Sequence, residues 1–334
     1  MALNYPRLDN ASGIWTMKEV TDAVKGGYWP NAGARGLTGG GFTPSASDVI
    51  DYITLASAGD AADFGNLSSG ARGGGHAAAS FTRCLWGGAQ VSGTRYNYID
   101  YVTIVTTGNS ADFGDLTTTN TQVAGAGNST RAIFMGGKAE GDGIHNVVSY
   151  LQMASLGNSI DFGDLSTNQA QATGVASPTR VMNGGGVTPA LVDTIEYFTI
   201  ASTGDGSDFG NLVATTADLA GVDSSTRGVF GGGYNPSLTN VIQYVEIAST
   251  GNAIDYGDLS AAREDLGRSS SSKRGLFCGG AEPGIVNTIE FISIAAGGTA
   301  TDFGNLSVAR SQGSGNSNSH GGLNDGNQGV VDTA

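Results

Sequence analysis

A five-residue motif headed by an aspartate recurs six times along the chain. Its copies read DFGNL, DFGDL or DYGDL, and an Asp-Phe-Gly sequence can hold a magnesium ion through its carboxylate. A catalytic centre needs one copy of such a motif, so six copies indicate a structural repeat. The motif starts at Asp63, Asp112, Asp161, Asp208, Asp255 and Asp302, in steps of 49, 49, 47, 47 and 47 residues.

An arginine recurs with the same period upstream of these aspartates. Because a planar guanidinium suits a carboxylate, we predict structural Arg-to-Asp contacts within or between the repeat units. Six calcium or anion sites are the alternative, but calcium needs several converging oxygen ligands and the motif offers at most two acidic side chains. The motif's phenylalanine is predicted to fill the core, and its glycine to allow a close approach or a bulge. The six arginines are Arg35, Arg83, Arg131, Arg180, Arg227 and Arg274.

Other residue types that support catalysis are few. His76, His145 and His320 fall at unrelated positions of the repeat, so the period predicts no zinc or copper site. Cys84 and Cys278 lie in equivalent segments of two units and are predicted to be buried hydrophobic residues. No nucleotide-binding loop, nucleophile elbow or zinc-protease motif occurs. We therefore expect no enzymatic activity, no cofactor and no metal site, although a glycosidase-type carboxylate pair stays open.

Composition and charge disfavour several further classes. The chain has 55 Gly and 7 Pro in 334 residues, below the roughly 25–30% that indicates low complexity. Its net charge of −14 opposes binding to nucleic acid or to an anionic membrane surface. No apolar run approaches the about 20 residues of a membrane helix, and no signal-peptide pattern occurs. We expect no membrane insertion, synthesis in a reducing cytoplasm and no structural disulfide.

The segments around each motif read as short strands. Each unit contains a stretch ending in two or three glycines, then an Ile-acid-Tyr element such as Ile99-Asp100-Tyr101, then a Gly-Asn or Gly-Asp turn leading into the Asp-Phe-Gly strand. A small-residue stretch before the next unit supplies a fourth strand. Four strands in about 48 residues without a helix are typical of a β-propeller blade. The sequence therefore predicts an all-β, six-bladed propeller of four-stranded blades.

The repeat resembles the kelch family of propellers. The diglycines Gly136-Gly137 and Gly279-Gly280, the aromatic Tyr150, and the runs 259–263 and 306–310, which each begin with Leu and end with Arg, match kelch landmarks. Where kelch repeats usually carry Trp, this chain has Phe or Tyr in the Asp-Phe-Gly motif. The resemblance covers residues 34 to about 323 and implies the same propeller architecture.

The two ends of the repeat region predict how the ring closes. The first unit begins at Ala34 without a preceding small-residue strand, whereas the last unit is followed by one, RSQGSGNSNSHGG. This surplus strand is expected to join the first blade. Closure protects the strand edges that an open array would expose.

The segments that follow the diglycines differ most between units, and all should lie on one face of the ring. That face is the predicted recognition surface. Arg95, Tyr96 and Tyr98 form its most contact-prone cluster, because Tyr and Arg offer large amphipathic surfaces. Tyr234 is a further candidate binding residue. A longer loop with no binding role is the alternative for the cluster.

Residues 1–33 do not fit the repeat, and residues 324–334 form a tail beyond the 34–323 propeller. The N-terminal segment carries a capping box, Thr16 to Glu19, before a predicted helix of about nine residues, 17–25. A helix this short needs a docking partner, either the propeller or a neighbouring subunit. The candidate anchor residues are Trp15, Met17, Val20, Val24 and Trp29.

This N-terminal segment followed by TGNAxDFGDL-like units resembles virion-associated proteins of tailed bacteriophages. The resemblance implies a structural protein that displays its propeller on the virion as part of a fibre, spike or capsid decoration, after synthesis in the host cytoplasm. Its partners would be other virion proteins or further copies of itself, with a host surface glycan or receptor as a possible target. The alternative is a soluble propeller that binds a ligand or hydrolyses glycans.

Overall fold

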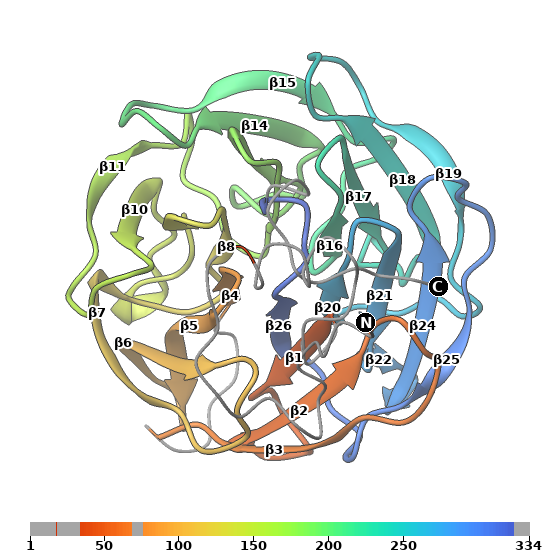
Figure 1. The fold of residues 1–334 in the computed structure, drawn as a ribbon. Helices are drawn as coiled ribbons and strands as arrows, with labels where there is room; N and C mark the ends of the chain where they lie inside the picture. The colour runs from red at the N-terminus through yellow and green to blue at the C-terminus, as the bar shows by residue number, and fades with distance from the viewer. Residues whose placement is uncertain (1–17, 19–33, 69–75, 324–334) are drawn as a thin grey trace.

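Six four-stranded antiparallel sheets stand in a ring around a central axis (Figure 1). The computed structural model describes residue 18 and residues 34–68 and 76–323. The innermost strands of neighbouring blades contact one another around the axis. The innermost strand of the sixth blade also contacts that of the first blade, so the ring is closed. The predicted all-β, six-bladed propeller is confirmed. The predicted helix 17–25 and the anchor residues Trp15, Met17, Val20, Val24 and Trp29 lie outside the described residues.

The strands of each blade are given from the axis outward. Blade 1 contains β26 (Ser314–Ser317), β1 (Arg35–Gly39), β2 (Val49–Thr54) and β3 (Ala62–Asn66). Blade 2 contains β4 (His76–Ala79), β5 (Arg83–Val91), β6 (Thr94–Thr103) and β7 (Ala111–Asn120). Blade 3 contains β8 (Ala124–Gly127), β9 (Arg131–Met135), β10 (Val147–Gln152) and β11 (Ile160–Asp164), with the 3-10 turn η1 (Glu140–Asp142) in a loop.

Blade 4 contains β12 (Thr173–Ala176), β13 (Arg180–Gly184), β14 (Thr194–Thr199) and β15 (Ser207–Asn211). Blade 5 contains β16 (Ala220–Asp223), β17 (Arg227–Gly231), β18 (Val241–Glu246) and β19 (Ile254–Asp258). Blade 6 contains β20 (Gly267–Ser270), β21 (Arg274–Cys278), β24 (Thr288–Ser293) and β25 (Thr301–Asn305), and a loop hairpin of β22 (Ala281–Glu282) and β23 (Gly284–Ile285).

The C-terminal strand β26 completes blade 1, as the sequence predicts. It pairs antiparallel with β1, with Leu37 opposite Asn316. The indole nitrogen of Trp86 in blade 2 donates to the carbonyl of Ser314 at 2.7 Å. Strand β26 is therefore tied both to its own sheet and to the next blade.

The hydrophobic core lies between the blades. In blade 1, Leu37, Ile50 and Phe64 pack against Cys84 and Trp86 of blade 2, and all five are at most 2% exposed. Five further clusters of the same kind fill the other interblade spaces. Burying these side chains supplies the main stabilisation of the ring, because no single thin sheet can bury both of its apolar faces alone.

The Asp-Phe-Gly motif forms a bulge in each outer strand. In blade 1, Ile50 pairs with Gly65 and Asp51 pairs with Asp63, so Phe64 is the extra residue. Its side chain is 2% exposed and belongs to the core. The bulge glycine meets the next blade closely: a Cβ on Gly114 would lie 2.4 Å from the carbonyl oxygen of Gly157. Both predictions for the motif's phenylalanine and glycine are confirmed.

The turn before each motif covers the outer edge of the preceding blade. The N–H of Gly108 donates to the carbonyl of Phe64 at 2.8 Å, and the side chain of Asn109 accepts from the N–H of Asn66 at 3.0 Å. The backbone bond recurs at all six junctions and the side-chain bond at five. Edge groups of the outer strands are thereby satisfied within the ring.

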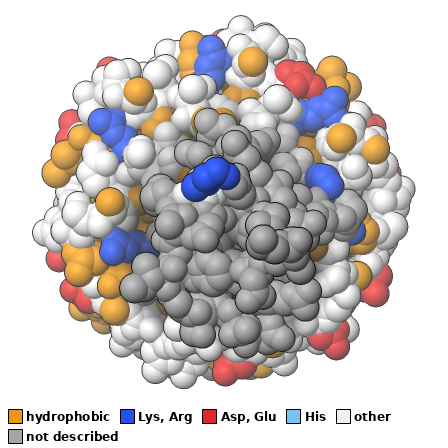
Figure 2. Space-filling model, viewed as in Figure 1, with side chains coloured by type: hydrophobic (Ala, Val, Ile, Leu, Met, Phe, Trp, Pro, Cys, Tyr) orange, Lys and Arg blue, Asp and Glu red, His pale blue; other side chains and the backbone are white. Residues whose placement is uncertain are grey.

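The predicted contact between the repeated arginines and the motif aspartates is wrong. Each arginine lies over the aromatic ring of its own third strand, with 4.6–5.2 Å from Cζ to the ring centroid. Its Nη1 donates to a carbonyl of the next blade at 2.6–3.3 Å, as from Arg83 to Met153. The six aspartates are exposed on the outer strands. The bulge turns the phenylalanine inward, so the preceding carboxylate points to water. Acidic side chains accordingly lie near the outline of the molecule, outside the basic ones (Figure 2).

Buried carboxylates occur instead in the Ile-acid-Tyr elements. Asp51 is 2.8 Å from Arg310 in the connection that leads to β26, and Glu290 pairs with Arg263 in the preceding connection. Both arginines belong to the kelch-like runs, and all four side chains are at most 2% exposed. Each pair joins neighbouring blades, so interblade ion pairs exist at a different position of the repeat from the one predicted.

Candidate binding site at the axial pocket

Five polar residues encircle the axis where the chain enters the innermost strands. Their spacing of 49, 47, 47 and 47 residues follows the repeat. All five have left-handed backbones with φ between 53° and 57°, a conformation that is uncommon for residues other than glycine. From the second member onward, each N–H donates to the carbonyl of the preceding member at 2.8–3.1 Å, so the five residues form a hydrogen-bonded chain. The five are Gln122, Gln171, Asp218, Asp265 and Gln312; the sixth position falls in 69–75, outside the described residues.

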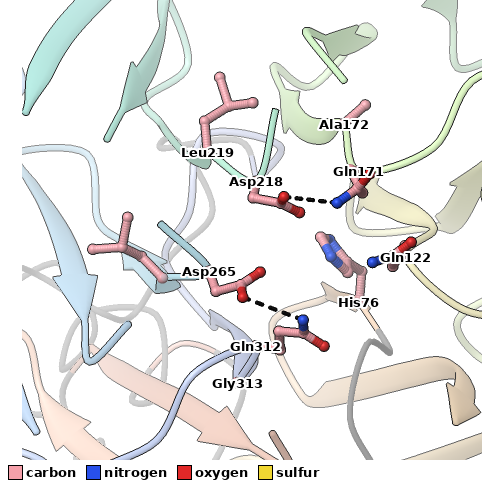
Figure 3. A pocket seen from close by; sticks show the side chains of 10 residues that line it. His76, Gln122, Gln171, Ala172, Asp218, Leu219, Asp265, Gln312 and Gly313 are labelled. Atoms are coloured by element: carbon pink, nitrogen blue, oxygen red, sulfur yellow. Dashed lines mark hydrogen bonds between the residues drawn. The ribbon is translucent and has the colours of Figure 1, made fainter. Parts of the chain in front are cut away.

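Their side chains line a small cavity, which we call the axial pocket (Figure 3). Gln171 Nε2 donates to Asp218 Oδ2 at 2.7 Å, and Gln312 Nε2 donates to Asp265 Oδ2 at 3.2 Å. His76, the first residue of β4, adds its imidazole to the lining. The cavity measures about 30 Å³, which is room for one water molecule or a group of similar size.

The two carboxyl groups of the axial pocket have different pKa values, and both values are raised. Burial, and then the neighbouring Asp265, raise the pKa of Asp218 to about 8. Burial raises the pKa of Asp265 to about 6. Burial, reinforced by Arg268, lowers the pKa of His76 to about 3, so this imidazole is neutral. Near pH 7 the two carboxyl groups together hold about one proton and one negative charge.

A second circle of residues surrounds the axial pocket. Each is the first residue after a diglycine. Each forms an isolated antiparallel β-bridge with the residue that precedes a pocket member, as Tyr234 does with Ala217. Tyr234 is 39% exposed. The circle contains Phe42, Lys138, Val187, Tyr234 and Ala281. We call this side of the ring, formed by the connections 40–48, 88–98, 136–146, 185–193, 232–240 and 279–287, the loop face.

Arg268 on β20 crosses the axis below the pocket. Its guanidinium donates to Thr173 Oγ1 at 2.8 Å, to the carbonyl of Gly221 at 3.1 Å and to the carbonyls of Gly125 and Gly174. These acceptors belong to three other blades. Small residues on the facing inner strands leave space for this one long side chain, which gives the axial pocket a floor.

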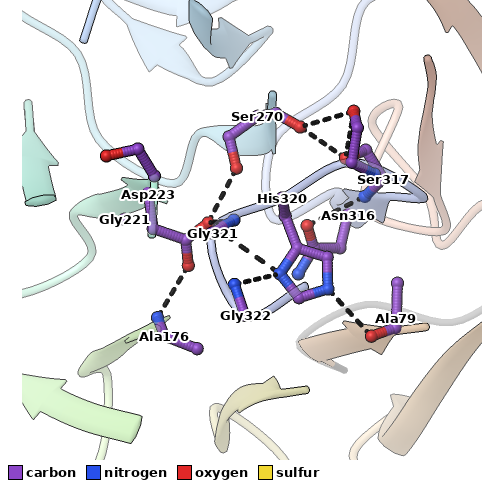
Figure 4. A network of polar contacts seen from close by, with 12 residues as sticks. Ala79, Ala176, Gly221, Asp223, Ser270, Asn316, Ser317, His320, Gly321 and Gly322 are labelled. Carbon is purple, nitrogen blue, oxygen red and sulfur yellow. Dashed lines mark hydrogen bonds and ion pairs between the residues drawn. The ribbon is translucent and has the colours of Figure 1, made fainter. Parts of the chain in front are cut away.

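The C-terminal segment Asn318–Leu323 closes the opposite end of the axis (Figure 4). His320 Nε2 lies 2.8 Å from the carbonyl oxygen of Ala79, and the N–H of Gly321 donates to Asp223 Oδ1 at 2.8 Å. His320 and Leu323 are fully buried. The axis is thus occupied by protein at that end.

The three residues of the predicted cluster, Arg95, Tyr96 and Tyr98, have different environments in the structure. Arg95 is 8% exposed, donates to the carbonyl of Ala139 at 2.9 Å and pairs with Asp142. It ties the long β5–β6 hairpin to the loop of blade 3, so its guanidinium is used within the ring, and a binding role for Arg95 stays a prediction. Tyr96 and Tyr98 stack with centroids 5.0 Å apart, and Tyr98 is 41% exposed.

Sequence reasoning placed Tyr234 among the segments that follow the diglycines, which the structure puts on the loop face, but it missed the five pocket residues. Their signal was available, because a polar residue recurs with the repeat period two positions before five of the six inner strands. It was hidden in stretches that are otherwise rich in small residues. His76, His145 and His320 lie apart in the ring, and no group of three His, Cys, Asp or Glu suited to a metal ion occurs in the described part of the chain. Cys84 and Cys278 are buried free thiols.

No protein-family model matches the chain, and no curated protein is similar to it. Within the described residues, no helix is both long and apolar enough to span a membrane.

Proposed function

We propose that this chain is a non-enzymatic structural protein of a bacteriophage virion that displays a rigid propeller and recognises a host surface glycan through its loop face. One observation carries the proposal. The ring is closed, and the connections that differ most between blades surround the polar axial pocket on one face. Rigid scaffolds that present variable loops are suited to recognition.

The chemistry of the loop face supports a glycan ligand. Tyr98 and Tyr234 present exposed aromatic surface, on which the apolar face of a sugar ring can pack. The axial pocket adds amide and carboxyl groups, which can donate to and accept from hydroxyl groups. An apolar rim with a few convergent polar groups is the usual composition of a small-molecule site.

The virion assignment rests on the resemblance of the repeat and of the N-terminal segment to phage particle proteins, and it includes the kelch-like relationship. In this proposal residues 1–33 attach the propeller to other virion proteins. Deleting 1–33 should abolish incorporation into particles while the isolated ring keeps the thermal unfolding transition of the full chain. Normal incorporation of the deletion variant would contradict the proposal.

A soluble glycan hydrolase is the second candidate, because Asp218 and Asp265 are adjacent carboxyl groups with separated pKa values, as an acid and base pair requires. Turnover assays on glycans that bind the protein separate the two candidates. Product formation that disappears in Asp218→Asn and in Asp265→Asn would favour the hydrolase. Binding without turnover would favour the structural protein.

A further inference from the structure

The axial pocket contains hydrogen-bonding groups that the protein leaves unused. Nδ1 of His76 and Oε1 of Gln122 are inaccessible to solvent and have no hydrogen-bond partner. Buried polar atoms in folded proteins are nearly always paired, so unpaired atoms beside a cavity indicate a place for a ligand atom. The side chains of both residues line the pocket, beside Asp218 and Asp265 (Figure 3).

Within the described ranges, the carboxyl groups of the pocket also have no cationic partner of their own. Gln171 and Gln312 each donate one amide hydrogen to them, and no ion pair to either aspartate occurs among the described residues. Lys138 is near enough to act on Asp218 only as the weakest of the electrostatic contributions. Arg268 directs its guanidinium at carbonyl groups and Thr173 below the pocket. A buried carboxylate without a paired cation is costly, so a cationic ligand group would be stabilised here.

We propose that the axial pocket binds a protonated primary amine, inserted between Asp218 and Asp265, as the ligand group that the loop face recognises. The inference rests on the proposed function, because it names the ligand chemistry of the same face. An amino sugar with a free amino group is the form of this ligand that fits glycan recognition.

The number and size of the groups fit an ammonium ion on a stem. An ammonium group has three N–H donors and no acceptor. Asp218, Asp265 and the neutral imidazole of His76 offer three acceptors. The cavity of about 30 Å³ admits the head group but no sugar ring. The remainder of the ligand would therefore rest on the second circle, against Tyr234 and its neighbours.

The first experiment compares matched ligands on the intact protein by calorimetric titration. At about pH 7, n-butylamine and glucosamine should bind in competition, whereas N-acetylglucosamine, which lacks the charged amine, should bind at least about tenfold more weakly. Binding of butylamine and glucosamine alike assigns the site to the amine. Binding of glucosamine alone shows that the sugar ring is also needed, which supports the amino-sugar form.

The second experiment compares matched variants. Asp218→Asn and Asp265→Asn should each weaken n-butylamine at least about tenfold, because each removes one of the two carboxyl groups that share the negative charge of the pocket. Asp255→Asn removes the same charge from the exposed outer strand and should leave the affinity unchanged. Thermal unfolding of each variant without ligand shows whether it is folded.

Affinity for n-butylamine, which stays protonated, should also rise at least about fivefold between about pH 5 and about pH 8 as the two carboxyl groups lose their protons. Among the described residues, Lys138 and Glu264 act electrostatically on these carboxyl groups, Arg268 acts on His76, and His76 stays neutral over this range. A flat pH profile would contradict insertion between the aspartates.

Any one of three results would overturn the inference. The first is equal binding of glucosamine and N-acetylglucosamine, and the second is unchanged affinity for n-butylamine in both folded aspartate variants. The third is full displacement of the amine by micromolar calcium, which would assign the pocket to a metal. Glycan binding that persists without the amine would leave the proposed function in place. Amine binding by a chain that is absent from virions would remove the virion role alone.

Discussion

Arg310 Nη2 lies 2.8 Å from Asp51 Oδ2, and both side chains are fully buried. The two residues are 259 positions apart, and their contact joins the last interblade connection to the first blade. Arg310 also donates to the carbonyl of Val49 at 2.8 Å. Closure of the ring therefore depends on a charged pair as well as on the pairing of β26 with β1.

Asp51→Asn should lower the free energy of unfolding by about 3–5 kcal/mol, because it leaves the buried guanidinium of Arg310 without its counter-charge. Glu246→Gln is the matched control, since Glu246 pairs with Arg227 on the surface and should contribute less than about 1 kcal/mol. Urea denaturation measures both. Equal effects of the two substitutions would show that the buried pair has no special role in closure.

Arg83→Met should destabilise the protein by about 1–3 kcal/mol, because it removes the bond to the carbonyl of Met153 and the contact with the Tyr101 ring. Asp112→Asn, in the motif of the same blade, should change stability by less than about 0.5 kcal/mol because that carboxylate is exposed. Denaturation midpoints distinguish this arrangement from an Arg83-to-Asp112 contact, in which both substitutions would destabilise.

Gly114→Ala should destabilise the ring by about 1–3 kcal/mol through overpacking alone, because the added Cβ would lie 2.4 Å from the carbonyl oxygen of Gly157. Its φ of 147° adds backbone strain for alanine. Gly143→Ala places a Cβ in open space and should be nearly neutral. The comparison is read from thermal melts, and similar melting temperatures would contradict the close approach of blades 2 and 3.

Removing residues 314–334 should abolish cooperative unfolding, because it deletes β26 and leaves the edge of β1 unpaired. The segment Asn318–Leu323 is lost as well, with the contacts of His320 and Gly321 to blades 2 and 5. Removing only 324–334 retains all of these contacts and should leave the melting temperature unchanged. A cooperative transition in the longer truncation would show that blade 1 closes without its C-terminal strand.

Stability should fall as pH rises from about 4 to about 8, in part because of Asp218. Burial raises the pKa of this group from 3.8 in the unfolded chain to about 8 in the folded one. The protonated form is therefore favoured by folding, so the contribution is complete below about pH 4 and is lost as pH rises through about 8. Asp218→Asn, which does not ionise, should flatten the profile of unfolding free energy against pH. An unchanged profile would place Asp218 in solvent.

Residue spacing alone was sufficient to predict the number of blades, the four strands in each, and the closure by a C-terminal strand. These features follow from local patterns: alternating apolar residues define strands, Gly-Asn turns define hairpins, and a period of about 48 residues can bury its apolar faces only against neighbouring copies. The roles of the motif residues Phe64 and Gly65 were predictable for the same reason, since both act where the pattern repeats.

Only the tertiary structure decided which acidic side chain each arginine contacts. Besides the six periodic arginines, the sequence contains Arg263 and Arg310 one repeat apart, and it contains two recurring acidic positions. The pairing predicted for Arg83 and Asp112 was wrong because a bulge turns the carboxylate outward. The observed partner of Arg310 is Asp51, which lies 259 positions away in the sequence. Local sequence patterns cannot predict a contact between residues so far apart. The axial pocket exists for the same reason: Asp218 and Asp265 acquire their raised pKa values only when ring closure brings five separate connections together and removes their water.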